Sequence, residues 1–294
     1  MSVDCSKTTP SKTAQDRLGG DAYGRREGDP LVHPMAVVAP GAVLGEGTRV
    51  GPFSVIGPDV TIGRNTIVGS HVVIEGYTHI GNDNLIYQFA SVGAVPQDKK
   101  FHGEPSTLEI GDKNVIREYV TIQPGTVGGG MKTVIGSGNL FMACTHVGHD
   151  CFIGDDNIFA NSVALAGHVR VSDRVIIGGL AGLHQFVSIG ELALLGAGSM
   201  VSKDIPPYCI AQGDRAALVG VNVMGLQRAG ISPAEVSICR KLFRELFFSS
   251  GNLAEALKAA QGTYSESRCG KVLLQFVAES ERGVASLRRS GGED

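Results

Sequence analysis

The chain has 294 residues, a formal net charge of −3, only 6% aromatic residues and no tryptophan. Because this weak negative charge offers no basic field to a polyanion or an anionic lipid surface, we expect neither nucleic acid binding nor membrane insertion. No apolar run approaches the ~18 residues of a membrane-spanning helix, no basic-then-apolar signal segment opens the chain, and the six cysteines form no CxxC pair, so we predict a cytoplasmic protein with reduced thiols.

Residues 1–29 are polar, contain glycine and show no hydrophobic periodicity. A segment of this composition cannot bury enough apolar surface to fix its backbone. We therefore predict a disordered extension over 1–29, ahead of a repetitive region that begins at about residue 30.

The region 30–220 repeats in sixes. An aliphatic residue stands at every sixth position in the series Val32, Val38, Leu44, Val50, Ile56, Ile62, Val68, Ile74, Ile80, Ile86 and Val92, which resumes in phase at Ile110, Ile116 and Ile122. After a one-residue phase shift the series runs through Ile135, Phe141, Val147, Ile153, Phe159, Leu165, Val171, Ile177, Leu183, Ile189, Leu195 and Val201. The residue after each aliphatic residue is usually glycine, and the residue four positions after it is mostly small or β-branched.

A period of six fits neither the 3.6 residues of a helical turn nor the alternation of an amphipathic strand. It fits short strands separated by sharp corners, with three hexads closing one triangular coil of 18 residues. Parallel strands of successive coils then stack ~4.8 Å apart. The aliphatic side chain points into the prism, and glycine can supply the positive φ that such corners need. The pattern predicts an all-β parallel β-helix over 30–220.

Two interruptions of this regular series should project outward as loops, at 94–109 and 124–133. The first contains the charged and polar sequence "VPQDKKFHGEP". Long loops on a rigid scaffold often carry function, so we predict a functional role for the first loop.

The hexads stop near residue 205, and we predict a small α-helical domain over 221–294. The sequence Ser232-Pro233-Ala234-Glu235 offers an N-cap, a proline at the first helical position and an acid in the first turn. An apolar stripe follows with helical spacing. Two further helices are predicted, one after Asn252 and one within 268–289.

Several histidines fall on one column of the predicted coil. Val147, Leu165 and Leu183 are spaced by 18 residues and should stack on successive coils. His146 and His149 flank the first, His168 follows the second, and His184 and Gln185 follow the third. The loop 94–109 leaves the series after Val92, on the same column, so Asp98, Lys100 and His102 are predicted to project toward the same edge.

Stacked imidazoles allow two kinds of chemistry. A neutral imidazole can act as a general base toward an attacking hydroxyl, with Asp150 orienting His149 and the N–H of Gly167, one coil on, stabilising the oxyanion. Histidines from neighbouring coils can instead hold zinc, as in the γ-class carbonic anhydrases on the same fold. Those sites need histidines five residues apart, whereas the spacing here is three, so we predict no metal.

The segments "HPMAVV", "VGPFSVIGP", "IYQFASVGAVPQDKKFHGEP", "HVGHDC", "LAGHV", "GLHQF", "PPYCIAQG" and "GVNVMGLQRAG" occur in this order over 33–230. On these segments the chain resembles the UDP-N-acetylglucosamine O-acyltransferase family of hexapeptide-repeat acyltransferases. The resemblance implies a left-handed β-helix, a homotrimer with active sites between subunits, and transfer of an (R)-3-hydroxyacyl chain from acyl carrier protein to the 3-OH of UDP-N-acetylglucosamine. This is the first step of lipid A biosynthesis in the cytoplasm of Gram-negative bacteria. It needs no cofactor beyond the phosphopantetheine of the carrier protein.

The resemblance also implies roles for individual residues. His149 would be the general base and Gly167 the oxyanion donor. Substrate contacts would come from Asp98, Lys100, His146, His168, His184 and Gln185, with Asn222 and Arg228 contacting the nucleotide or the phosphopantetheine. Ala197 would set the acyl length, and a residue larger than glycine there suggests a shorter chain. Met224 and Ala229 depart from the family pattern, which leaves the contacts to the nucleotide base open.

Other functions stay open at this stage. The acceptor could be the 3-amino analogue of the sugar, which would make the product an amide. The later N-acyltransferase of the same pathway has the same repeats but carries a uridine-binding domain in front of them, where this chain has only residues 1–29. A γ-carbonic-anhydrase-like metal enzyme would bind zinc. A repeat scaffold without activity would leave the histidine edge unexplained.

Overall fold

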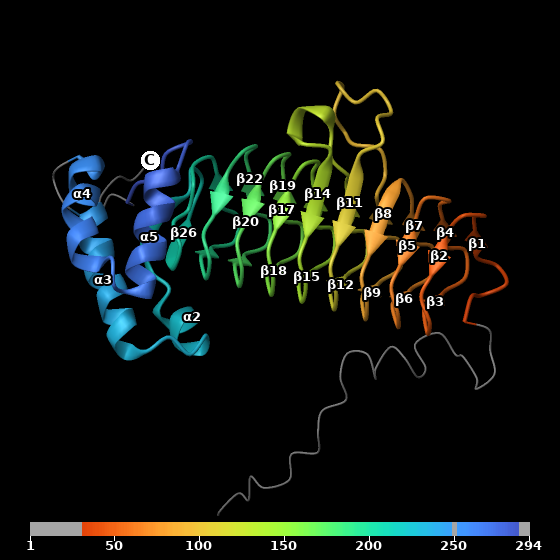
Figure 1. Ribbon diagram of the computed structural model, residues 1–294, viewed down its shortest axis with the longest axis horizontal. Helices are drawn as coiled ribbons and strands as arrows, with labels where there is room; N and C mark the ends of the chain where they lie inside the picture. Colours follow the sequence, from red (N-terminus) through yellow and green to blue (C-terminus); the bar gives the residue numbers. More distant parts are fainter. Residues whose placement is uncertain (1–30, 249–251, 288–294) are drawn as a thin grey trace, which may run out of the picture.

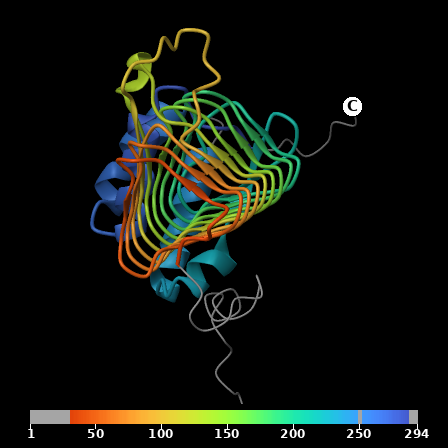
Figure 2. The same cartoon turned by 90° about the vertical axis from the view of Figure 1, so that its right-hand side faces the viewer.

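The computed structural model describes residues 31–248 and 252–287. The extension predicted at 1–29 lies outside the described residues. Within them, short parallel strands form three sheets that wind around one prism (Figures 1 and 2). This arrangement confirms the predicted parallel β-helix of hexapeptide repeats.

Each sheet takes one strand from every coil. The first sheet comprises β1 (Val37–Val38), β4 (Val55–Ile56), β7 (Val73–Ile74), β10 (Ser91–Val92), β13 (Thr121–Ile122), β16 (His146–Val147), β19 (Ala164–Leu165), β22 (Gly182–Leu183) and β25 (Met200–Val201). The second comprises β2 (Val43–Leu44), β5 (Thr61–Ile62), β8 (Tyr77–Ile80), β11 (Thr107–Ile110), β14 (Lys132–Ile135), β17 (Phe152–Ile153), β20 (Arg170–Val171) and β23 (Ser188–Ile189). The third comprises β3 (Arg49–Val50), β6 (Ile67–Val68), β9 (Leu85–Ile86), β12 (Val115–Ile116), β15 (Leu140–Phe141), β18 (Ile158–Phe159), β21 (Ile176–Ile177), β24 (Leu194–Leu195), β26 (Cys209–Gln212) and β27 (Ala217–Val221).

The pairing register follows the 18-residue count. Val147 pairs with Leu165, and Leu165 pairs with Leu183, so the predicted column is confirmed. The column extends backward to Ile122 and Val92 across both interruptions. The side chains of this column point into the prism and are 3% exposed or less, so burial of the aliphatic repeat fixes the register.

The prediction that the corner glycines supply positive φ is wrong for most of them. Gly63 does not have positive φ; a Cβ there would lie 2.6 Å from the carbonyl carbon of Gly81 on the next coil. The glycine is therefore required by close packing of backbones. Positive φ is instead carried by non-glycine residues two positions later in the corner, including Asp150 at 59°, His168 at 63° and Phe186 at 65°. Such conformations cost roughly 1 kcal/mol or more each and persist because the neighbouring coils hold them.

Both interruptions leave the prism at the corner between the first and second sheets, where Figure 2 shows them projecting together. They end earlier than predicted, because β11 begins at Thr107 and β14 at Lys132. The extra strand residues are needed inside the prism, where Leu108 and Thr133 are fully buried and paired with each other. The second loop contains a short 3-10 helix, η1 (Val127–Gly129).

A ladder of asparagines lines the interior. The side-chain oxygen of Asn114 accepts the backbone N–H of Asn139 at 2.9 Å, and its amide nitrogen donates to Asn84 and to the carbonyl of Gly136. The ladder continues from Asn139 to Asn157. These side chains are fully buried, so each coil satisfies polar backbone groups of the next.

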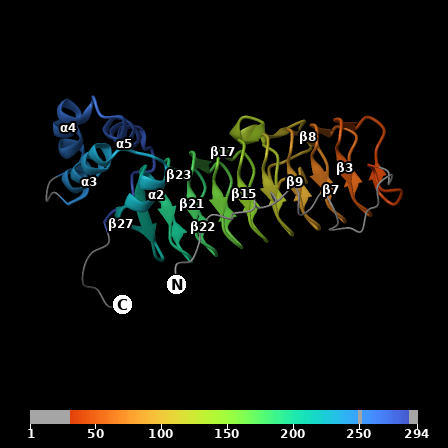
Figure 3. The ribbon, with the colours of Figure 1, turned by 90° about the horizontal axis from the view of Figure 1, so that it is seen from below.

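Helices cover one end of the β-helix (Figures 1 and 3): α2 (Val223–Arg228), α3 (Pro233–Phe247), α4 (Leu253–Tyr264) and α5 (Arg268–Glu279). The three predicted helices are present, and the Ser232 hydroxyl caps α3 by accepting the N–H of Glu235. Sequence reasoning missed α2 and the antiparallel pair of β26 and β27. No helix in the described residues is long and apolar enough to cross a membrane.

Candidate active site

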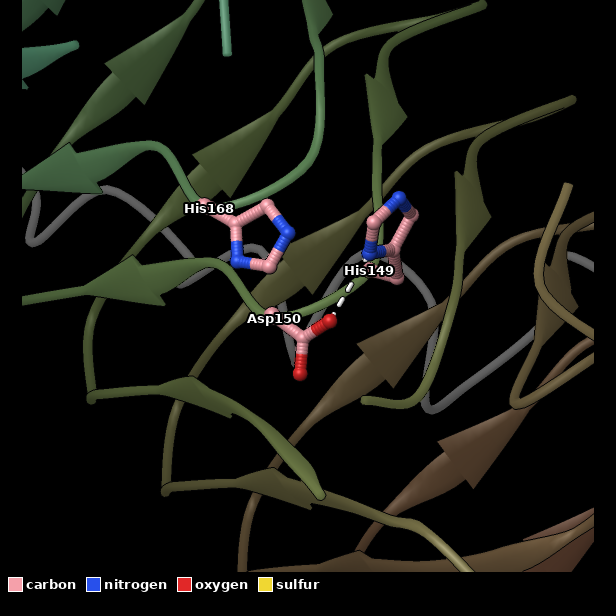
Figure 4. A group of neighbouring side chains, drawn as sticks. All are labelled: His149, Asp150 and His168. Carbon is pink, nitrogen blue, oxygen red and sulfur yellow. Dashed lines mark hydrogen bonds and ion pairs between the residues drawn. The ribbon is translucent and has the colours of Figure 1, made fainter. Parts of the chain in front are cut away.

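The predicted histidine edge lies at the corner where the chain passes from the first sheet to the second. His149 and Asp150 stand between β16 and β17, and His168 stands one coil on, between β19 and β20. Figure 4 shows the two imidazoles and the carboxylate converging. The rings of His149 and His168 meet edge to face, with centroids 5.0 Å apart.

His149 and Asp150 form a buried pair. The Nδ1 of His149 lies 2.8 Å from Oδ2 of Asp150, and the two residues are 8% and 1% exposed. A carboxylate in this position accepts a hydrogen bond from Nδ1–H, which assigns the neutral tautomer that leaves Nε2 free as a base. The pair therefore has the orientation that general-base catalysis requires.

The Asp150 carboxylate is held from the second loop. Its Oδ1 accepts the backbone N–H of Thr126 at 2.9 Å, and its Oδ2 accepts the Thr126 hydroxyl at 2.6 Å. Thr126 is 3% exposed. These donors compensate the loss of water around a buried anion.

Gly167 faces the imidazole of His149. A Cβ at Gly167 would lie 2.5 Å from Cε1 and 2.6 Å from Nε2 of that ring, so any larger residue here would displace the imidazole. The backbone N–H of Gly167 donates to no group among the described residues, as is common at this corner position. The geometry therefore combines a base, an unoccupied backbone donor and a close approach between them.

His168 and His146 flank the pair. The His168 ring stacks on Phe186 with centroids 4.3 Å apart. Burial lowers the pKa of His168, and the carboxylates of Asp150 and Asp98 oppose that shift. Burial, with a smaller contribution from the charge of His149, also lowers the pKa of His146, whose Nδ1 lies 2.7 Å from the Thr121 hydroxyl. Both imidazoles thus favour the neutral form.

A cavity of about 610 Å³ opens beside Asp150 and His168. It lies over the second sheet and is bordered on the far side by the end of α5 and the segment that follows it. Phe152, Arg170, Phe186, Phe276 and Arg282 contribute to its wall. His149 does not line it, so this cavity borders the carboxylate side of the pair.

The loop 94–106 brings two predicted substrate residues to the same corner. Asp98 is close enough to His168 for its charge to act on that imidazole, and its side chain accepts the backbone N–H of Lys100. Lys100 is exposed, and no carboxylate pairs with it among the described residues. An ammonium group placed in this way is available to an anionic ligand.

The remaining predicted residues lie further from the pair. His184 and Gln185 share the corner but are exposed, and the His184 ring contacts the carbonyl of Gln185. Ala197 is exposed at a different corner, between the third and first sheets. Arg228 is exposed at the end of α2.

Asn222 is 5% exposed and caps α2. Its side-chain oxygen accepts the N–H of Gly225, and its amide donates to the carbonyl of Leu192. The side chain therefore has a structural role whatever else it contacts, and its predicted ligand contact stays a prediction.

The donor set for a metal is limited in the described residues. His149, Asp150 and His168 each offer one ligand atom, and these atoms lie within 4.8 Å of one another. The γ-carbonic-anhydrase alternative needs a third histidine, and here the carboxylate already accepts bonds from Thr126 and His149. Thr126, Asp150 and His149 instead form a hydrogen-bonded chain.

Sequence reasoning missed Thr126 as a site residue. It occupies the fourth position after Ile122, where the repeat places small or β-branched residues, so it matched a structural rule. The cavity residues Arg170 and Phe186 were missed as well. Arg170 belongs to none of the quoted segments and Phe186 closes the segment "GLHQF", but only the coil register brings them beside His168.

The hexapeptide repeats identify the general class to which this protein belongs. Residues 41–76 match the family described as bacterial transferase hexapeptide, six repeats. The chain is thus a hexapeptide-repeat transferase.

Residues 204–285 match the family described as UDP N-acetylglucosamine O-acyltransferase, domain 2. The acyl-[acyl-carrier-protein]–UDP-N-acetylglucosamine O-acyltransferase of Myxococcus xanthus is 51% identical to this chain, over 86% of it and 98% of the relative. That of Aliarcobacter butzleri is 45% identical, over 88% and 99%. The solved LpxA of Acinetobacter baumannii superposes with a TM-score of 0.85 at 42% identity, over 87% and 100%. The chain belongs to the acyl-[acyl-carrier-protein]–UDP-N-acetylglucosamine O-acyltransferase (LpxA) family.

Proposed function

We propose that this acyltransferase moves an (R)-3-hydroxyacyl chain from acyl carrier protein to the 3-OH of UDP-N-acetylglucosamine, as the first step of lipid A biosynthesis in the cytoplasm. Family membership supports the reaction class. The observation that carries the mechanism is the buried His149–Asp150 pair with Gly167 against the imidazole.

In the proposed reaction, Nε2 of His149 takes the proton of the sugar 3-OH while the oxygen attacks the thioester carbonyl. Asp150 stabilises the imidazolium that forms, and the N–H of Gly167 donates to the developing oxyanion. The tetrahedral intermediate then expels the phosphopantetheine thiolate, which receives the proton from the imidazolium. An ester forms and a thioester breaks, so no redox partner is needed.

Substrate binding is proposed for the loop and corner residues. Lys100 supplies a point charge suited to a diphosphate, and Asp98, His168, His184 and Gln185 offer polar contacts to the sugar. His146 contributes a neutral imidazole beside the base. Arg228 and Asn222 are proposed for the nucleotide or the phosphopantetheine.

We further propose a homotrimer with sites between subunits. His149 and the acyl-length residue Ala197 stand at different corners of one chain, so a single acyl chain reaches both more readily if they come from neighbouring subunits. The corner that carries Ala197 also exposes a stack of aromatic rings, with Phe53, Phe89 and Tyr119 at 51, 45 and 56% exposure. Light scattering should give a trimer, and Phe89→Lys should weaken it; a monomeric wild-type protein would reject this part.

The reaction is tested with purified protein, UDP-N-acetylglucosamine or its 3-amino analogue as acceptor, and 3-hydroxyacyl carrier proteins as donors. We expect the hydroxyl sugar to be preferred, and His149→Ala to lose about 10²–10⁴-fold in kcat while it still binds the sugar nucleotide. His79→Ala removes an exposed histidine on β8 and should leave kcat unchanged. Undiminished turnover by the His149 variant would reject the base assignment, and preference for the amino sugar would replace the ester by an amide.

A further inference from the structure

We infer that Thr126 is a positioning residue that holds Asp150 in the orientation His149 needs, and that the loop between β13 and β14 exists at this corner to supply it. The inference rests on the proposed general-base role of His149. It concerns how the pair is oriented, and it adds a residue that acts through Asp150 without touching substrate.

Thr126 gives the carboxylate two donors from one residue. Its backbone N–H reaches Oδ1 at 2.9 Å and its hydroxyl reaches Oδ2 at 2.6 Å. The same Oδ2 faces Nδ1 of His149 at 2.8 Å. Among the described residues, Thr126 and His149 are the donors to this carboxylate. Two-point contact fixes the plane of the carboxylate as well as its position.

The loop also packs directly against the carboxylate of Asp150. A Cβ on Gly129 would lie 2.0 Å from Cγ of Asp150, so the turn of η1 presses directly on the carboxylate. The turn closes on Thr126, whose carbonyl accepts the N–H of Gly129 and of Met131. The backbone of Thr126 is therefore fixed at both its N–H and its carbonyl.

The loop between β13 and β14 is hydrogen-bonded to the loop between β10 and β11. The carboxylate of Glu104, in the loop that carries Asp98 and Lys100, accepts the N–H of Val127 at 3.3 Å and that of His102 at 2.8 Å. The residue next to Thr126 thus contacts the predicted substrate loop. The Glu104–Val127 hydrogen bond, the peptide bond between Val127 and Thr126, and the hydrogen bonds of Asp150 with Thr126 and His149 thus connect that loop to the imidazole.

The chemical consequence concerns the tautomer of His149. With Oδ2 aimed at Nδ1, the proton stays on Nδ1 and the lone pair stays on Nε2. If the carboxylate loses its hydroxyl donor it can turn from the ring, and the fraction of productive tautomer falls. Because a hydrogen bond to a charged buried group is involved, kcat should fall about 10–100-fold.

The direct test compares Thr126→Val, which removes the hydroxyl and keeps the side-chain shape, with Thr126→Ser, which keeps the hydroxyl. We expect the valine variant to lose about 10–100-fold in kcat with KM for UDP-N-acetylglucosamine within about twofold, and the serine variant to recover most of kcat. Thr133→Val is the matched control, because the buried Thr133 hydroxyl has no partner in the described residues. If the valine variant does not fold, Thr126→Ala removes the hydroxyl without placing a methyl group beside Asp150.

A double-mutant cycle separates positioning from general loss of structure. In an Asp150→Asn background, Thr126→Val should lower kcat by less than about twofold, because the group through which it acts is already lost. A full additional loss in that background, or unchanged kcat in Thr126→Val alone, would overturn the inference. If His149→Ala keeps its activity, the proposed function fails first; if only the Thr126 variants keep theirs, the positioning role fails alone.

Discussion

Replacing Gly167 by alanine should disable catalysis while leaving the fold intact. The new Cβ would stand 2.5, 2.6 and 3.0 Å from Cε1, Nε2 and Nδ1 of His149. Ordinary contact between such atoms is about 3.5–4.0 Å, so the imidazole must move by about 1 Å. Gly167 does not have positive φ, so alanine adopts its backbone conformation without strain.

The magnitude follows from that displacement. A shift of 1 Å at a reacting group costs about 10²-fold in rate, and it also stretches the 2.8 Å contact to Asp150. The alanine keeps its N–H, so the proposed oxyanion donor survives and the loss reports on the base. We expect kcat to fall about 100-fold with little change in the midpoint of thermal unfolding.

The assay is steady-state transfer from a 3-hydroxyacyl carrier protein to UDP-N-acetylglucosamine, with thermal unfolding followed by circular dichroism on the same samples. Gly220→Ala is the control, because Gly220 has no atom within 4 Å of an added Cβ and no positive φ. A Gly167→Ala enzyme with kcat within twofold of the wild type would refute the claim that the imidazole must sit against this glycine.

Three further outcomes are expected. Burial lowers the pKa of His146 and His168, so the unfolded state binds more protons than the folded state near pH 6. The free energy of unfolding should therefore fall as the pH drops from about 7.5 to 5.5. Thermal melts should show this loss of stability, and His146→Gln should reduce it. Asn114→Ala leaves the buried N–H of Asn139 without its acceptor and should cost about 2–3 kcal/mol in urea unfolding; an unchanged midpoint would contradict the role of the ladder. Ala197→Gly should move the preferred acyl chain to a longer length across a series of 3-hydroxyacyl carrier proteins, and an unchanged preference would remove Ala197 as the length determinant.

The register of the β-helix could be predicted because its cause is local in the sequence. Each inward aliphatic residue recurs after a fixed count, and the count places Leu165 over Val147 without any knowledge of distant contacts. The same count brought His149, His168 and the first loop to one corner. Caps also have local signals, which is why the start of α3 at Ser232 was predicted.

The features that could not be predicted depend on contacts that the 18-residue repeat does not encode. The corner glycines looked like turn residues, yet at Gly63 the requirement comes from the neighbouring coil. The hairpin of β26 and β27 follows the last hexad and has no period of its own. Thr126 stands at a repeat position that usually carries a small or β-branched residue for packing. Nothing in the sequence therefore marked its hydrogen bonds to Asp150.

The stacked coils also determine how the molecule opens. Each coil pairs only with the one before and the one after it. Its stability therefore depends on the interfaces with these two neighbours, as in other solenoids. The strands β1, β2 and β3 pair with following coils, whereas the far end is closed by β26, β27 and the helices. Within the described residues, we therefore expect fraying to start at the coil of β1, β2 and β3, where amide hydrogens should exchange fastest. The coil that carries His149 lies between paired neighbours, so a molecule that has lost its outermost coil should still hold the proposed catalytic pair of His149 and Asp150.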